Sequence, residues 1–176
     1  MNEFKESIKS ALNEYFEGLI KCLDGLTEPE LYWQPSLESN HITWLVWHMA
    51  RVEDRWINSI VGGKETVWDK NNWNEKFGVD QEDYGKGYNK EDISKMPKME
   101  MEKLLNYYNE ERIEIFKVIE NLNSEDLKNS YPSPSRGKVT GKWILGHVIV
   151  EESQHLGQMA YIRAVSYTHL TLPTKA

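Results

Sequence analysis

The stretch GHVIVEESQHLGQMAYIR, from Gly146 to Arg163, repeats charged or polar residues at intervals of four: His147, Glu151 and His155. Four residues are about one turn of an α-helix, so the three side chains share one helical face. Apolar residues are expected on the same face: Ile144, Val148, Met159 and Ile162. That face is therefore predicted to point inward. Because burying an imidazole or a carboxylate without a partner is unfavourable, the row indicates a specific task.

Three further segments carry apolar residues at helical spacing, roughly over residues 4–23, 42–61 and 98–122. The helix of the opening stretch begins near residues 140–142. The long irregular segment 64–98 reads as a surface crossover that carries a short helix. No rhythm of strands and turns is visible. The pattern predicts an all-α fold, an up-and-down four-helix bundle with a long crossover connection, in which the second and fourth helices are adjacent.

Two stretches near the end of the chain interrupt the helical pattern. YPSPSRGKVTG, residues 131–141, contains prolines and glycines and is expected to be a linker. AVSYTHLTLPTKA, residues 164–176, breaks the amphipathic pattern and resembles read-through of a sequencing adaptor. We therefore expect one domain over residues 1–164, followed by a non-native or disordered tail over residues 165–176.

Composition excludes several classes of partner. The net charge of −7 argues against a nucleic-acid partner, whose binding surface is usually basic. No apolar run is long enough for a membrane span, and the first residues lack the apolar core of a signal peptide, so no membrane partner is expected. Cys22 is the only cysteine, which excludes an internal disulfide and favours a cytoplasmic location. The sequence leaves the oligomeric state open and allows a homodimer.

The histidine row predicts a metal site with two alternatives. His147 and His155 lie roughly 12 Å apart along the helix axis, too far to share one ion easily. An ion could take His147 with Glu151, or Glu151 with His155, and a third ligand must come from another helix. His48 is the remaining histidine within an apolar helix. Two imidazoles and one carboxylate would leave coordination positions open, as in catalytic metal sites.

Two motifs resemble those of a known family. WLVWHMARVEDRW, residues 44–56, resembles the second-helix signature of the DinB/YfiT-like superfamily. EESQHLGQMAYIR, residues 151–163, resembles its last-helix signature, in which a metal-binding His stands before x-Gly-Gln. VWDKNNWNEKFGV, residues 67–79, is similar to the long connection of one branch. The resemblance extends to Ala164 and implies a four-helix bundle that holds a divalent metal, commonly zinc or nickel.

Carried over by position, the resemblance implies that His48, Glu151 and His155 are the metal ligands. It places His147 behind them, in a supporting position without direct contact to the ion. Many members have a third His where Glu151 stands, and the Glu matches the mycothiol-dependent maleylpyruvate isomerase branch. Arg55 is seven residues after His48, on nearly the same face, and is a candidate for binding an anionic substrate.

Other residues are expected to have ordinary structural roles. Charged side chains that follow His48 are expected to form mostly a solvated face with local ion pairs: Arg51, Glu53, Asp54 and Arg55. Indole side chains are expected to line the core and the pocket: Trp44, Trp47, Trp56 and Trp143.

The family resemblance also implies a function. The superfamily includes transferases and isomerases that depend on mycothiol or bacillithiol, so an open metal position would bind a low-molecular-weight thiol that attacks a small electrophile. No catalytic residue of the chain itself is assigned. Two alternatives stay open: a non-catalytic metal-binding stress-response module, and a non-haem iron enzyme, since two His and one carboxylate also suit Fe(II).

Overall fold

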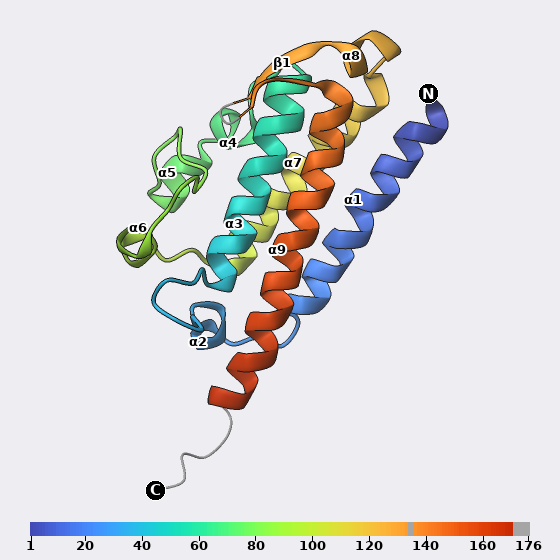
Figure 1. The fold of residues 1–176 in the computed structure, drawn as a ribbon. Coiled ribbons are helices and arrows are strands. Elements are labelled where there is room, and N and C mark those ends of the chain that lie inside the picture. The colour runs from blue at the N-terminus through green and yellow to red at the C-terminus, as the bar shows by residue number, and fades with distance from the viewer. Residues whose placement is uncertain (134–135, 171–176) are drawn as a thin grey trace, which may run out of the picture.

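Four long amphipathic segments bury their apolar faces against one another as a helical bundle in the computed structural model, which describes residues 1–133 and 136–170 (Figure 1). The long helices are α1 (Asn2–Leu23), α3 (Ile42–Glu53) with its π-helical continuation η1 (Asp54–Val61), α7 (Met101–Asn121) and α9 (Gly141–Leu170). Short elements connect them: α2 (Glu28–Leu31), α4 (Val67–Lys70), α5 (Trp73–Phe77), α6 (Lys90–Lys95), α8 (Ser124–Lys128), β1 (Ser130–Ser133) and β2 (Gly137–Thr140). The predicted all-α four-helix bundle is confirmed.

Helix α3 packs against both α7 and α9, while α1 covers the opposite side of the same two helices. The Tyr107 hydroxyl of α7 contacts the carbonyl of Ala50, and Val118 lies near Gly62, so α3 and α7 run in the same direction. The long connection between them carries the chain back to the other end of the bundle. The adjacency predicted for the second and fourth helices, α3 and α9, is also confirmed.

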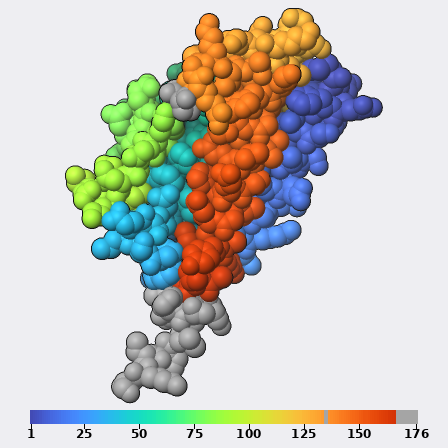
Figure 2. Space-filling model, in the orientation of Figure 1, coloured from blue at the N-terminus to red at the C-terminus, as the bar shows by residue number. Residues whose placement is uncertain are grey.

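The crossover segment contributes to the core, and it forms three short helices where one was expected. Trp68 is fully buried and stacks on Phe77, with ring centroids 6.0 Å apart. Trp73, also buried, stacks on Phe77 as well, with ring centroids 5.5 Å apart. In the space-filling view the segment lies against the side of the bundle next to α3 (Figure 2). These contacts hold the loop that follows α5 close to α3.

The expectation of a linker after α8 is wrong in one respect, because residues 130–133 and 137–140 form two paired strands. Strands β1 and β2 pair antiparallel, with Tyr131 opposite Val139. Gly137, the first residue of β2, has a positive φ of 72°, a conformation that favours glycine. The strands have four residues each and β1 contains Pro132, so they do not show the alternation that predicts a strand. The paired strands deliver the chain to the start of α9.

Helix α9 continues to Leu170, past the domain boundary expected at Ala164. Residues 171–176 of the expected tail lie outside the described residues. The non-native origin of residues 165–176 stays a prediction. Within the described ranges, no helix combines the length and apolar character that a membrane span requires.

Candidate metal centre

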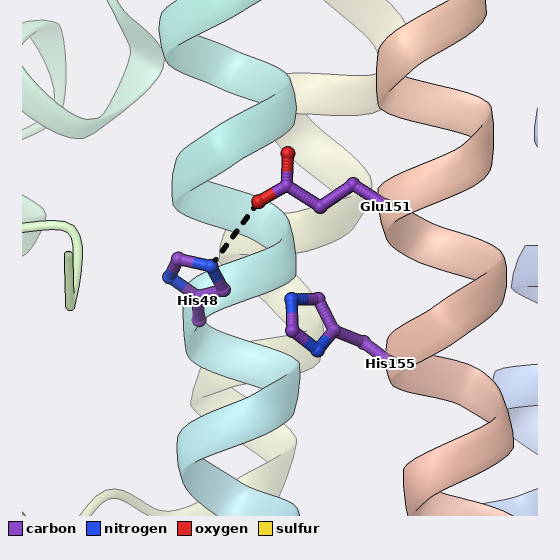
Figure 3. Close-up of side chains that lie close together, drawn as sticks. All are labelled: His48, Glu151 and His155. Atoms are coloured by element: carbon purple, nitrogen blue, oxygen red, sulfur yellow. Dashed lines mark ion pairs between the residues drawn. The ribbon is translucent and has the colours of Figure 1, made fainter. Parts of the chain in front are cut away.

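The antiparallel packing of α3 and α9 brings His48 beside Glu151 and His155 (Figure 3). Each of the three offers one ligand atom, and these atoms lie within 4.8 Å of one another. His48 Nε2 is 3.5 Å from Glu151 Oε1, and the two imidazole centroids are 5.1 Å apart. In the part of the chain that the structure describes, this is the one group of His, Cys, Asp and Glu side chains placed to hold an ion.

Both histidines are oriented through their Nδ1 atoms. His48 Nδ1 is hydrogen-bonded to the backbone carbonyl of Tyr84, in the crossover segment. Since a carbonyl oxygen only accepts, His48 must carry its proton on Nδ1. His155 Nδ1 lies 3.0 Å from Oε1 of Gln158 and donates to it in the same way. Each Nδ1 hydrogen bond leaves Nε2 as the nitrogen available to an ion, and in the neutral tautomer that nitrogen is unprotonated, the form in which imidazole binds a metal ion.

Gly85 fixes the loop that holds His48. Its φ is +81°, and a Cβ atom there would lie 2.8 Å from Trp44 Cζ2 and 3.1 Å from His48 Nδ1. Trp44 itself stacks on the His48 ring, with centroids 4.7 Å apart. Arg51 anchors the same loop by donating from Nε to the Asp83 carbonyl at 3.0 Å. This requirement for glycine was not visible in the sequence, because it depends on how closely the loop approaches α3.

The electrostatic environment favours the metal-binding protonation states. Burial alone would raise the pKa of Glu151, but its hydrogen bond with His48 and the neighbouring imidazoles lower it overall. Burial lowers the pKa of His155. The site therefore favours an ionised carboxylate beside a neutral imidazole, the states in which these groups ligate metals. Two imidazole nitrogens and a carboxylate fit a divalent ion such as zinc or nickel.

His147 lies outside the group of His48, Glu151 and His155, a position that suits a supporting role. Its Nε2 is 3.1 Å from Glu151 Oε2, so it contacts the carboxylate oxygen other than the one nearest His48. Its ring stacks on Trp143, with centroids 4.4 Å apart, and meets the ring of Trp56 edge-on at 6.2 Å. The structure thus holds His147 firmly and aims it at Glu151 rather than at His155.

A cavity of about 310 Å³ opens onto these side chains. Its described lining consists of Trp44, His48, Val52, Arg55, Trp56, Tyr84, Gly85, Lys86, Gly87, His147, Glu151 and His155. Arg55 and Trp56 belong to η1, and π-helical turns are frequent at functional sites. The sequence prediction placed Arg55 near His48, and the structure puts both in the lining of one cavity.

The expectation of a solvated face after His48 is wrong for three of its four residues: Arg51, Glu53 and Asp54 are buried. Glu53 accepts a hydrogen bond of 2.6 Å from Tyr108 and lies 3.3 Å from Arg112. No local pattern shows that α7 supplies partners for Glu53, or that the crossover segment supplies backbone carbonyls for Arg51. Arg55 alone of the four is partly exposed.

Glu53 belongs to a second polar group, the core carboxylate cluster, which consists of Glu53, Glu111 and Glu152, all with 0% exposure. Burial raises the pKa of Glu53 to about 7 and that of the other two well above the ordinary value. The opening stretch did contain a signal for it, because Glu152 falls at core spacing between Val148 and Met159. The sequence prediction concerned its neighbour Glu151 instead, because Glu151 shares the regular spacing of His147 and His155.

These features define a four-helix-bundle protein with an open His/Glu site between two antiparallel helices. The sequence profile of the Mycothiol-S-transferase family matches residues 7–166, so the chain belongs to this family. The resemblance to the DinB/YfiT-like superfamily is thereby confirmed. A solved structure described as the conserved protein of locus from Enterococcus faecalis is similar in fold, with a TM-score of 0.78, 24% identity, and coverage of 90% of this chain and 94% of that chain. A comparison with curated proteins gave no match.

Proposed function

We propose that the protein is a metal-dependent S-transferase or isomerase that uses a low-molecular-weight thiol of the bacillithiol or mycothiol type on small electrophiles. The observation that carries the proposal is the convergence of His48, Glu151 and His155 at an open cavity. Membership of the Mycothiol-S-transferase family supports the thiol chemistry. A cytoplasmic location and a homodimer stay predictions from the sequence.

The chain's own residues would prepare the site for a thiol. A divalent ion, zinc or nickel, held by His48, Glu151 and His155 would supply positive charge that favours the thiolate form of a nearby thiol. The Nδ1 hydrogen bonds fix both imidazoles, and His147 fixes the second oxygen of Glu151. The indole of Trp44 covers the His48 ring and keeps water from that side of the site.

The reaction itself requires one bond to form and one to break. In an S-transfer, the thiol sulfur bonds to the electrophilic carbon, and the leaving group departs from that carbon with its electron pair. The thiol proton passes to solvent. In an isomerisation, the sulfur adds to a double bond and is eliminated after rotation, so the thiol is regenerated. Cys22 is not proposed as the nucleophile, because it is buried away from the cavity and burial raises the pKa of its thiol.

Metal analysis and thiol titration test the proposal. Protein purified without a His-tag is expected to contain zinc or nickel, and the cobalt-substituted form is expected to show a sulfur-to-cobalt charge-transfer band with at least one thiol of a panel. The band should vanish in His155→Ala. If no thiol changes the spectrum and no electrophile is consumed faster than without protein, a non-catalytic metal-binding module is the better description. Iron as the native metal would favour the non-haem iron enzyme.

A further inference from the structure

We propose that Arg55 and Lys86 form an anion subsite in the cavity, so that a small molecule bound here carries a carboxylate. The carboxylate can belong to the thiol or to the electrophile. The assignment of the reactive end as a thiol rests on the proposed function. The subsite itself is a property of the cavity, and it can be tested without a thiol.

The two cations reach the cavity from separate elements. Arg55 comes from η1, and Lys86 lies between two glycines in the loop that also holds His48. The Arg55 guanidinium lies over the Tyr84 ring, 4.6 Å from its centroid, which keeps it at the cavity wall. Its ion pair with Glu82 is long, at 3.9 Å, and the Glu82 side chain is 86% exposed. Such a surface pair is weak, so the guanidinium can exchange this partner for a ligand.

The charge of the cavity differs from that of the protein. Glu151 is the only acidic residue among the described residues of the lining, whereas Arg55 and Lys86 are both cationic. A divalent ion on the ligands would neutralise Glu151 and leave the lining positive. The chain as a whole carries a net charge of −7. A concentrated positive field inside an acidic protein attracts and orients anions.

The spacing and the walls indicate the shape of the ligand. Arg55 is seven residues after His48, roughly 10 Å farther along the helix, and its side chain leans back toward the start of α3. Val52, one turn after His48, and Trp56, next to Arg55, add apolar surface to the lining. A ligand that spans them needs an anionic end, an alkyl or aromatic middle, and a reactive end near His48.

Two matched pairs of compounds separate charge from thiol chemistry. The probes are 6-mercaptohexanoate and its primary amide, and heptanoate and its primary amide, measured by calorimetry on untagged protein with its own metal. In both pairs the acid should bind about tenfold more tightly than the amide, as expected for a charge-assisted hydrogen bond. Arg55→Gln and Lys86→Met should each reduce this preference to about threefold or less. Lys90→Met removes the same charge outside the cavity and should leave the preference intact.

Each outcome supports or overturns the subsite. Equal binding of acids and amides, or no binding of either acid, overturns it. So does a preference that survives in both variants but is lost in His155→Ala, because the carboxylate then binds at the ligand residues. If the preference for acid over amide is greater in the thiol pair than in the alkyl pair, one molecule spans the anion subsite and the metal-ligand residues, and the carboxylate belongs to the thiol. If the preference is equal in the two pairs, the carboxylate belongs to the electrophile. If the thiols bind no better than the alkyl compounds while the acid preference holds, the subsite stands and the proposed thiol function fails.

Discussion

Glu151 and Glu152 are neighbours on α9, yet their side chains enter two different environments. Glu151 is partly exposed and faces the cavity between His48 and His147, and its pKa is lowered. Glu152 is fully buried, lies 3.5 Å from the Tyr108 hydroxyl, and its pKa is raised well above the ordinary value. One step of about 100° around a helix therefore separates a carboxylate suited to a cation from a carboxyl group that retains its proton.

The two regions satisfy their buried polar groups by different means. The site between α3 and α9 combines a carboxylate with imidazoles and an opening to solvent, an arrangement to which a metal ion can be added. The core carboxylate cluster is sealed, and Arg112 is the cation that pairs with Glu53 there. Both oxygens of Glu111 lack a hydrogen-bond partner within the described residues. Bound protons therefore neutralise carboxyl groups of the cluster, whereas a bound cation would neutralise the carboxylate of the site.

The largest effect is expected from removing the cation of the core carboxylate cluster. Arg112 also donates to the Tyr15 hydroxyl and the Leu12 carbonyl, so it ties α1 to the rest of the bundle. Arg112→Met should lower the free energy of unfolding by about 3–5 kcal/mol, measured by urea denaturation. Lys117→Met, which removes an exposed cation from the same helix, should have little effect. A loss below about 1 kcal/mol in Arg112→Met would show that the cluster does not depend on this charge.

Alanine variants of Gly85 and Gly87, two glycines of one loop, distinguish the loss of support for His48 from the effect of backbone strain. Gly85→Ala places a Cβ against Trp44 and His48, whereas a Cβ at Gly87, which has a similar φ of +74°, would meet no atom of the described residues within 4 Å. Both alanine variants should lose about 1–3 kcal/mol of stability from the strained backbone. Gly85→Ala alone should also lose about 10–100-fold in metal affinity, because the Tyr84 carbonyl moves away from His48. Equal metal affinities, measured by competition with a chelator, would contradict this role.

The core carboxylate cluster should make stability fall as pH rises. Burial raises the pKa of Glu53 to about 7, from an ordinary value of 4.5, and raises that of Glu111 well above the same ordinary value. Protonated in the folded state, these groups contribute stability that is complete below pH 4.5 and is lost as pH rises through their folded-state pKa values. Glu111→Gln should flatten this dependence and raise stability at pH 8 by on the order of 1–3 kcal/mol.

Urea denaturation at a series of pH values between 5 and 9 measures this dependence. Glu102→Gln, an exposed change on the same helix, should keep the wild-type profile. An unchanged slope in Glu111→Gln, or a loss of stability at pH 8, would show that Glu111 is ionised in the folded protein.

The smallest effect is expected at His147. Because it contacts Glu151 but lies outside the ligand group, His147→Ala should still bind metal, with affinity reduced about tenfold. His155→Ala should lose most of the metal, as determined by elemental analysis after dialysis. Equal losses of metal from the two variants would contradict the assignment of Glu151 with His155, because His147 would then contact the ion as well or in place of His155.

Apolar periodicity is a local property, so the helices could be predicted from the sequence, and their pairing followed from the need to bring His48 near Glu151 and His155. The spacing of His147, Glu151 and His155 limited the site to two pairs, and the family resemblance selected one. The structure adds the position of His48 relative to Glu151 and the acceptors that orient both imidazoles. The three candidate ligands could thus be proposed from the sequence, whereas the orientation of their side chains could not.

The core carboxylate cluster and the Gly85 loop could not be predicted in the same way. Glu53 is tolerated in the core because Tyr108 and Arg112 approach it from a helix more than fifty positions later in the chain. A local pattern assigns such a charge to solvent. Gly85 is required by contacts with α3, which exist only after the crossover segment has packed.

The metal content of Glu151→Gln and Glu152→Gln tests the central claim most directly. Both variants replace a carboxyl group by an amide at adjacent positions of α9, so the size of the side chain and its helix context are matched. Elemental analysis of untagged protein should find the wild-type amount of zinc or nickel in Glu152→Gln and little metal in Glu151→Gln. Wild-type protein without a bound divalent metal, or equal metal in the two variants, would contradict the assignment of His48, Glu151 and His155 as the metal ligands.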